Sequence, residues 1–126
     1  MGKLANKVAI ITGAGQGVGL GIARTFATAG ASLVITGRRE ESLQELAEEL
    51  GEKVEVLPLV VDVRDRAAME AAIGGLPERF GKLRGLINNA GLAFGTDPAP
   101  KCSLDAWDTM VGTNIKGLLY TCLLLL

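Results

Sequence analysis

The residues with the clearest chemical potential form a glycine-rich run near the N-terminus. A strand-like segment, Lys7–Thr12, leads into a loop that reads Gly13-Ala14-Gly15-Gln16-Gly17-Val18-Gly19, and a helical pattern follows at once. Glycine lets the backbone approach a ligand closely, because no Cβ stands in the way. A helix N-terminus adds unpaired N–H groups and the positive end of the helix dipole. The segment therefore predicts an anion site, most often for phosphate.

Two common phosphate-binding loops can be tested against this run. The Walker loop needs Gly-Lys-Ser/Thr, which the sequence lacks, so hydrolysis of a nucleoside triphosphate is poorly supported. The dinucleotide pattern GxGxxG fails from every possible starting glycine. The pattern that fits is TGxxxGxG, from Thr12 to Gly19. The alternative is a glycine-rich turn without a ligand, and the position of the loop directly after the first strand argues against it.

Charge at the end of the second strand bears on the choice of nucleotide. NAD-binding folds place an acid there to hold the ribose 2′-hydroxyl, whereas this chain has Arg38-Arg39 and no acid before Glu40. A guanidinium suits a 2′-phosphate, which it can grip through paired N–H donors. The alternative is that the two arginines are simply exposed to solvent and that Glu40 and Glu41 neutralise their charge. Two arginines at a helix N-terminus oppose its dipole at a cost of some tenths of a kcal/mol, which favours a functional role and NADP over NAD.

The elements that must position these residues alternate along the chain. Near-continuous apolar runs are typical of a parallel sheet covered on both faces; they are Lys7–Thr12, Ser32–Gly37, Val54–Val61 and Leu86–Asn88. Helical patterns separate the runs; the predicted boundary residues are Gly30, Gly51, the N-cap Asp65, Gly74-Gly75 with Pro77, and Ser103. These features predict an α/β fold of the Rossmann type, a doubly wound parallel sheet with strand order 3-2-1-4. Its ligand site lies at the carboxyl ends of the strands, where the glycine loop falls.

Length and composition exclude several other classes of protein. The 126 residues suit one dinucleotide-binding domain, residues 1–126, with 48% hydrophobic residues. A net charge of −1 without a basic block argues against nucleic-acid binding. No histidine is present and the two cysteines are far apart, so a metal site has little support. The first six residues lack an apolar signal segment, and Leu118–Leu126 is too short to span a bilayer, so we expect a cytoplasmic protein.

The chain resembles the short-chain dehydrogenase/reductase family in three ordered motifs. The TGxxxGxG loop matches the cofactor signature of that family, Asn88-Asn89-Ala90-Gly91 matches a second signature after strand 4, and Asn114-Ile115-Lys116-Gly117 matches an Asn-x-x-Gly segment in a long interface helix. The resemblance covers the whole chain but only about the first half of a typical member. It implies the cofactor-binding half of an NADP-dependent oxidoreductase, which transfers hydride between NADP(H) and an alcohol or carbonyl substrate.

The resemblance also implies residue roles. Asp62 and the Val63 backbone match the adenine-edge contact, although Asp62 could also simply close a strand. Thr12 matches a structural hydrogen-bond partner of the Asn89 segment, which lines the adenosine-ribose side. The full set of implied cofactor-binding residues is Gly13, Gly15, Gln16, Gly17, Val18, Gly19, Arg38, Arg39, Asp62, Val63, Asn89, Ala90 and Gly91.

The implied catalytic set of Asn, Ser, Tyr and Lys is only partly present. Asn114 matches the asparagine, which holds a proton-relay water in the family. The only tyrosine is Tyr120, with Leu124 where the motif needs lysine, and a tyrosine of ordinary pKa near 10 cannot act as a base at neutral pH. We therefore expect residues 1–126 to bind cofactor without turnover. Gly112 departs from the polar residue common in the family and weakens the helix by about 1 kcal/mol just before Asn114.

The end of the chain favours association or truncation. Cys122–Leu126 stops within a helical pattern without a cap, and in the family this helix packs against a partner subunit. We expect a homo-oligomer formed through this helix; the alternatives are a non-catalytic assembly module and a piece of a longer enzyme. Several segments resemble the NADP-dependent dehydrogenases of serine and other 3-hydroxy acids; they are Gly37–Arg39, Leu43–Leu46, Gly91–Gly95, Pro98–Lys101 and Trp107–Met110.

Overall fold

The computed structural model describes residues 2–80, 83–87, 89–91, 103–117 and 119 of the chain. Predictions that concern Asn88, Pro98–Lys101, Tyr120 and Cys122–Leu126 lie outside these residues.

The core of the fold is a four-stranded parallel sheet. Its strands are β1 (Val8–Ile11), β2 (Ser32–Gly37), β3 (Val56–Val60) and β4 (Leu83–Ile87), in the order β3-β2-β1-β4. β1 pairs with β2 from Val8↔Ser32 to Ile11↔Ile35, and on its other side with β4 up to Ile11↔Ile87. The predicted Rossmann-type order 3-2-1-4 is confirmed, and it places the residue after β1 at the centre of the carboxyl edge.

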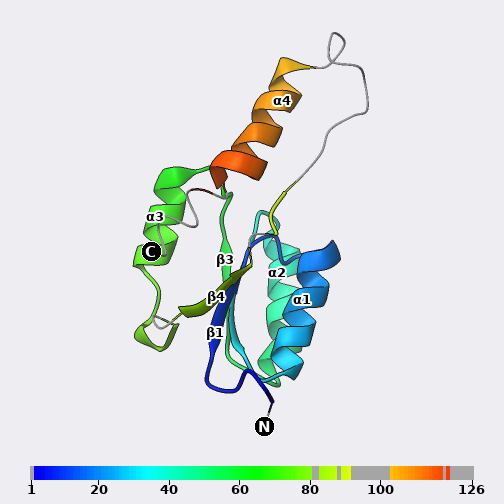
Figure 1. The fold of residues 1–126 in the computed structure, drawn as a ribbon, viewed down its shortest axis with the longest axis vertical. Coiled ribbons are helices and arrows are strands. Elements are labelled where there is room, and N and C mark those ends of the chain that lie inside the picture. The colour runs from blue at the N-terminus through cyan, green and yellow to red at the C-terminus, as the bar shows by residue number, and fades with distance from the viewer. Residues whose placement is uncertain (1, 81–82, 88, 92–102, 118, 120–126) are drawn as a thin grey trace.

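Helices cover both faces of this sheet (Figure 1). On one face, α1 (Gly17–Thr28) and α2 (Glu40–Gly51) bury Ala23, Leu43 and their neighbours against Ala9 and Ile11 of β1. On the other face lie α3 (Arg66–Gly74) and a short 3₁₀ helix, Glu78–Phe80. The buried Phe80 of that 3₁₀ helix packs against Val8 and Ile10. The alternation of side chains along β1 therefore supplies both halves of the core, as a sheet covered on both faces requires.

Most helix boundaries agree with the predictions. Gly30 follows α1 with φ +96°, and Asp65 caps α3 by accepting a hydrogen bond from Ala68 N at 3.0 Å. α3 ends at Gly74, where a break was predicted. Gly51 was expected to lie beyond α2 but is its last residue, and Glu52 is the C-cap.

β4 begins three residues earlier than the predicted segment Leu86–Asn88. The pairing shifts its register between Val8 and Ala9, opposite the start of β4. Arg84 and Gly85 are not strand-forming residues, so the sequence pattern hid the first part of the strand, which its pairing with β1 holds in place.

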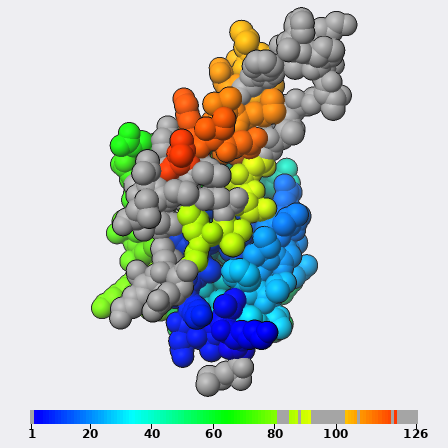
Figure 2. Space-filling model, viewed as in Figure 1, coloured from blue at the N-terminus to red at the C-terminus, as the bar shows by residue number. Residues whose placement is uncertain are grey.

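The last described helix is not the continuous α-helix that was predicted. α4 (Leu104–Val111) begins at the N-cap Ser103, as expected, but passes into a π-helix, Gly112–Gly117. A π-helix has i→i+5 hydrogen bonds, so the helix that was expected to run from Ser103 through Asn114 changes its hydrogen-bond pattern at Gly112. α4 stands beyond the end of the sheet (Figure 1), and Figure 2 shows it projecting from the body of the molecule in orange. No helix in the described part of the chain is long and apolar enough to cross a membrane.

Candidate functional site

A cleft of about 320 Å³ opens at the carboxyl ends of the strands. It takes its lining from the segments that follow all four strands and from one residue of the π-helix. The lining residues are Gly13, Gly15, Gln16, Gly17, Val18, Thr36, Gly37, Arg38, Arg39, Ser42, Leu43, Val61, Asp62, Val63, Asn89, Ala90, Gly91 and Thr113. All the predicted cofactor-binding residues except Gly19 are among them.

The glycine loop packs tightly against the segment after β4. Gly13 has φ +66°, and a Cβ there would lie 2.8 Å from Ala90 Cα. Gly19 lies behind the loop, where a Cβ would overlap Gly13 O and lie 2.5 Å from Asn89 Nδ2. Asn89 Nδ2 in turn donates a hydrogen bond to Gly13 O at 3.0 Å. Gly19 therefore permits this close approach from behind and does not itself line the cleft.

Thr12 joins the two segments that form the floor of the cleft. Its buried Oγ1 accepts hydrogen bonds from Asn89 N at 3.1 Å and Ala90 N at 3.0 Å, and donates to Ile87 O at 3.4 Å. The predicted structural role of Thr12 is confirmed. The N–H of Asn89 is shared with Ile87 O at 3.1 Å, so the hydroxyl of Thr12 matters most for the N–H of Ala90.

The two helices that begin at the cleft have no side-chain cap. The N-cap residues are Gln16 for α1 and Arg39 for α2, and neither side chain accepts a hydrogen bond from its helix. The helices that begin elsewhere, α3 and α4, are capped by Asp65 and Ser103. The first N–H groups of α1 and α2 are consequently available to an acceptor in the cleft.

Positive charge gathers where β2 meets α2. Arg38 and Arg39 are exposed, and within the described residues neither guanidinium has a hydrogen-bond or ion-pair partner, although Glu40 and Glu41 lie in the first turn of α2. Ser42, a residue that the sequence did not single out, lines the same corner. This corner can receive an anion through two guanidinium groups, a hydroxyl and a helix N-terminus.

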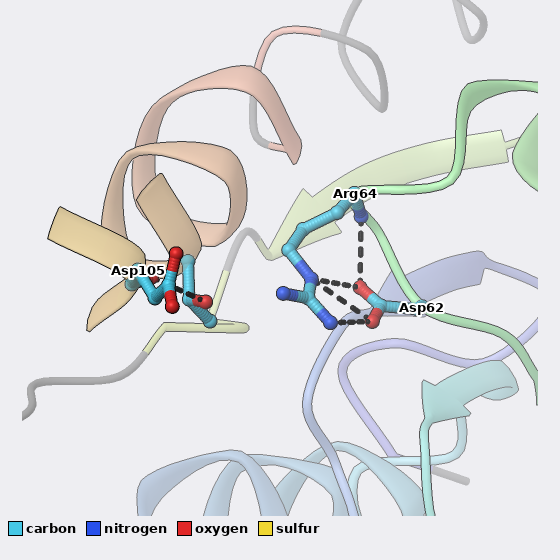
Figure 3. Close-up of polar contacts among 4 residues, drawn as sticks. Asp62, Arg64 and Asp105 are labelled. Atoms are coloured by element: carbon cyan, nitrogen blue, oxygen red, sulfur yellow. Dashed lines mark hydrogen bonds and ion pairs between the residues drawn. The ribbon is translucent and has the colours of Figure 1, made fainter. Parts of the chain in front are cut away.

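Asp62 also lines the cleft and is held by Arg64 (Figure 3). Arg64 Nε donates to both carboxylate oxygens at 3.1 and 3.0 Å, Arg64 Nη2 donates to Oδ2 at 2.6 Å, and Arg64 N donates to Oδ1 at 2.9 Å. These hydrogen bonds lower the pKa of Asp62 against the opposing effect of burial, and the charge of Arg38 adds to the lowering. Asp62 is therefore an ionised acceptor. Arg64 was not predicted, although its spacing of two residues from Asp62 is that of a local Asx turn.

Two buried hydroxyls of residues that line the cleft have no hydrogen-bond partner among the described residues. They are Thr36 Oγ1 at the end of β2 and Thr113 Oγ1 in the π-helix. A buried hydroxyl without a partner is costly, and both hydroxyls belong to residues that line the cleft, although the oxygens themselves are buried. Thr113 could not be found from the sequence, because an α-helical spacing does not describe this segment.

The predicted catalytic residue, Asn114, lies next to the cleft but not in its lining. It is exposed on the π-helix, and a Cβ added to Gly91 would lie 3.1 Å from Asn114 Oδ1. The structure thus brings Asn114 to the segment after β4, at the mouth of the cleft. Among the described residues, no group of three or more His, Cys, Asp or Glu side chains could hold a metal ion.

Comparison with known proteins shows which family has this fold and these motifs. The family model described as short chain dehydrogenase matches residues 7–126. The sulfoacetaldehyde reductase 2 of Chromohalobacter salexigens is 53% identical over 111 residues, which is 88% of this chain and 44% of that protein. The NADP-dependent 3-hydroxy acid dehydrogenase YdfG of Escherichia coli K12 is 46% identical over 113 residues, 90% of this chain and 45% of that protein. The chain thus spans less than half the length of these two relatives.

Solved structures of dehydrogenases have the same fold as this chain. The closed form of serine dehydrogenase complexed with NADP⁺ superposes with a TM-score of 0.88 at 44% identity, over 94% of this chain and 47% of that chain. An NAD⁺-bound xylitol dehydrogenase superposes with a TM-score of 0.92 at 27% identity, over 98% of this chain and 48% of that chain. Both nicotinamide cofactors therefore occur among proteins with this backbone.

Proposed function

Because the chain belongs to the short-chain dehydrogenase family, we propose that residues 1–126 form a single nucleotide-binding domain, the NADP-binding half of an oxidoreductase. The observation that carries the proposal is the cleft, in which a glycine loop, two uncapped helix N-termini and two exposed arginines surround one volume. The full activity would be hydride transfer between NADP(H) and an alcohol or carbonyl substrate. The family match and the NADP-dependent relatives support this activity.

The residues of the cleft fit the parts of a dinucleotide. The pyrophosphate would lie on the loop from Gly13 to Gly19 and take hydrogen bonds from the N–H groups that begin α1. The adenine amino group would donate to Asp62, with the backbone of Val63 beside it. Asn89, Ala90 and Gly91 would line the ribose.

Arg38 and Arg39 favour NADP over NAD. A 2′-phosphate would meet two guanidinium groups and the start of α2, whereas a 2′-hydroxyl would meet no carboxylate at the end of β2. The relatives named for NADP dependence support this choice, and the NAD⁺-bound neighbour shows that the backbone alone does not decide it.

The nicotinamide cofactor, when bound, supplies the hydride chemistry. The part of this chain would be to bind the nucleotide, to orient it with the glycine loop, and to place Asn114 at the mouth of the cleft for a proton relay. The Ser and Tyr-x-x-x-Lys residues of the family are absent from the sequence, so we expect no turnover from these 126 residues. Relatives named for sulfoacetaldehyde and 3-hydroxy acids support a small anionic hydroxy or carbonyl substrate in the complete enzyme.

Titration calorimetry with NADPH and NADH tests the proposal. We expect NADPH to bind more tightly, and Arg38→Asp to weaken NADPH binding about 10- to 100-fold while leaving NADH nearly unchanged, because only the 2′-phosphate loses a charge-assisted hydrogen bond. Arg66→Asp makes the same charge change on α3, outside the cleft lining, and should alter neither affinity. Folded protein that binds neither nucleotide would refute the proposal.

An assembly role is the second candidate, and an exposed apolar stripe favours it. Leu104, Val111, Ile115 and Leu119 are between 43% and 77% exposed on α4 and the segment after it. We propose that this stripe mediates the formation of a homo-oligomer. The oligomer would be either a complete enzyme that also binds cofactor or an assembly module without catalytic activity. The cytoplasmic location expected from the sequence stays a prediction.

A further inference from the structure

β3 is the outermost strand of the described sheet, and one of its two sides has no neighbouring strand within that sheet. Its exposure fits this position: Val60 is 49% exposed and the other residues of β3 are half-buried, whereas the inner residues of β2 are fully buried. An edge strand presents unpaired N–H and C=O groups, to which a strand of another molecule can be added. The edge of β3 is thus a second surface, besides the stripe on α4, through which copies of the chain could join.

The residue types of β3 favour such pairing, with one exception. The segment Val56–Val61 reads V-L-P-L-V-V, six apolar residues without a charge. Short uncharged segments with high strand propensity and no proline are the ones that pair between molecules. β3 meets these conditions except that Pro58 stands at its centre. The effect of Pro58 therefore depends on which side of the strand its backbone nitrogen faces.

The hydrogen bonds between β2 and β3 show that the nitrogen of Pro58 faces outward. Glu55 O accepts from Leu33 N at 2.9 Å, and Val61 N donates to Gly37 O at 3.0 Å. The backbone groups of successive residues in a paired strand point alternately to its two sides. Pro58 lies three residues from Glu55 and three from Val61, so its backbone groups face away from β2.

The outer side of β3 would otherwise offer a row of N–H groups. They belong to Val56, to the residue at position 58 and to Val60, spaced about 6.6 Å apart. Proline has no N–H, so the middle donor is missing, and the proline ring stands where the carbonyl of an added strand would approach. The pairing with β2 loses nothing, because position 58 makes no hydrogen bond on that side. Pro58 thus removes only a bond that an added strand would need.

We propose that Pro58 closes the free edge of β3 to a second copy of the chain and so confines self-association to other surfaces. The partner that it excludes is β3 of that second copy. Two identical edges related by a twofold axis would pair antiparallel and join the two sheets into one. The inference is independent of the proposed function, because Pro58 does not line the cleft.

Light scattering of the purified chain tests the proposal, in an Ile115→Lys background that removes association through α4. We expect Pro58→Val to double the mass of this parent, because valine restores the N–H and favours a strand. Pro58→Ala restores the same N–H with a weaker strand propensity, so it should dimerise less tightly. Hydrogen exchange at the Val60 amide should slow in the Pro58→Val dimer, which a mere loss of stability would not cause.

Two further variants separate an effect on the edge from an effect on the fold. Val60→Pro, added to Pro58→Val, moves the missing N–H along the same outer side and should restore the mass of the parent. Leu59→Ala removes apolar contacts of the same strand and keeps Pro58 in place. It should lower the urea midpoint without changing the mass. Titration with NADPH should give the same affinity for the parent and for Pro58→Val.

Each contrary result has a distinct meaning. A Pro58→Val variant with the mass of its parent would overturn the inference, because the restored N–H would not have opened the edge. An increase in mass that Val60→Pro does not reverse, or that Leu59→Ala reproduces, would also overturn it, because the association would then not use the edge. A parent that binds no NADPH, with a Pro58→Val variant that dimerises, would refute the proposed function and leave this inference intact.

Discussion

Thr12 shows how much of the cleft depends on a single hydroxyl. Its Oγ1 serves two backbone N–H groups from a segment 77 and 78 residues further along the chain. No charge is involved, and the methyl group of the side chain makes no hydrogen bond. The hydroxyl can therefore be removed with little change in shape, which makes Thr12 a clean site for substitution.

Thr12→Val should lower the free energy of unfolding by about 1–3 kcal/mol, because the N–H of Ala90 loses its acceptor while the N–H of Asn89 keeps only Ile87 O. It should also weaken NADPH binding, since those residues line the cleft. Urea denaturation and calorimetry give the two quantities. Thr12→Ser keeps the hydroxyl and should cost less than half as much; equal losses for Val and Ser would show that the methyl group matters and the hydrogen bonds do not.

The Asp62–Arg64 pair should make the protein less stable at low pH. The pKa of Asp62 is lowered in the folded protein, so the pair contributes stability at every pH above the ordinary carboxyl pKa of about 3.9. That contribution is lost as the pH falls through the lowered pKa. Because both side chains are more than a quarter exposed, at 36% and 27%, its size should stay below about 1 kcal/mol.

Urea denaturation of the wild type and of Arg64→Met at pH 7, 5 and 3 measures this effect. The difference in unfolding free energy should be equal at pH 7 and 5 and smaller at pH 3. In an Asp62→Asn background the difference should no longer depend on pH. A difference that grew towards pH 3 would have the wrong sign and would contradict the lowered pKa.

Among the elements, α1 offers two glycines in contrasting surroundings. Gly19 meets Gly13 O and Asn89 Nδ2, whereas Gly21, two residues later on the exposed side, has no atom within 4 Å of an added Cβ. The same substitution at these two positions therefore separates helix propensity from the packing of the glycine loop.

Gly19→Ala should destabilise the protein by about 1–3 kcal/mol through overpacking and should abolish tight NADPH binding. Gly21→Ala should stabilise it by about 0.5–1 kcal/mol and leave binding unchanged. Thermal denaturation with and without NADPH measures both effects. Similar behaviour of the two variants would show that the loop does not need its close contact with Asn89.

Elements with a strong local pattern could be predicted from the sequence, and those set by tertiary contacts could not. β2 was predicted with its correct ends, because an apolar run stands between two turns. The start of β4 was missed, because Leu83 and Gly85 are held in the strand by pairing with β1 and Arg84 lies at the register shift between them. The π-helix was missed for a similar reason: nothing in the residue types of Gly112–Gly117 distinguishes i→i+5 from i→i+4 bonding.

The candidate site divides in the same way. Residues recognisable by motif, such as Gly13 and Arg38, were found, because their types are tied to an anion ligand. Thr113 and Arg64 were not found, because the role of each depends on a neighbour that the fold brings to it. A threonine or an arginine carries no sign of that neighbour in the sequence.

For the whole molecule, the apolar stripe on α4 and beyond predicts association. Light scattering should give a mass above the 13.1 kDa of one chain. Ile115→Lys should lower that mass, because a charge would be buried in an apolar contact. Val60→Lys places the same charge on an exposed valine of β3 and should have no effect. A wild-type monomer would contradict the proposed oligomer.

The central position of β1 also sets the order in which the protein can fold. β1 pairs with β2 soon after both are synthesised, but its other neighbour, β4, is more than seventy residues away. Closing so long a loop carries an entropic cost, and contacts between distant residues form slowly. On the ribosome the N-terminal part of the chain emerges first. The glycine loop therefore cannot pack against Asn89 and Ala90 until that segment has been synthesised. Nucleotide in the cell can therefore stabilise only the last stage of folding, and a nascent chain gains nothing from it earlier.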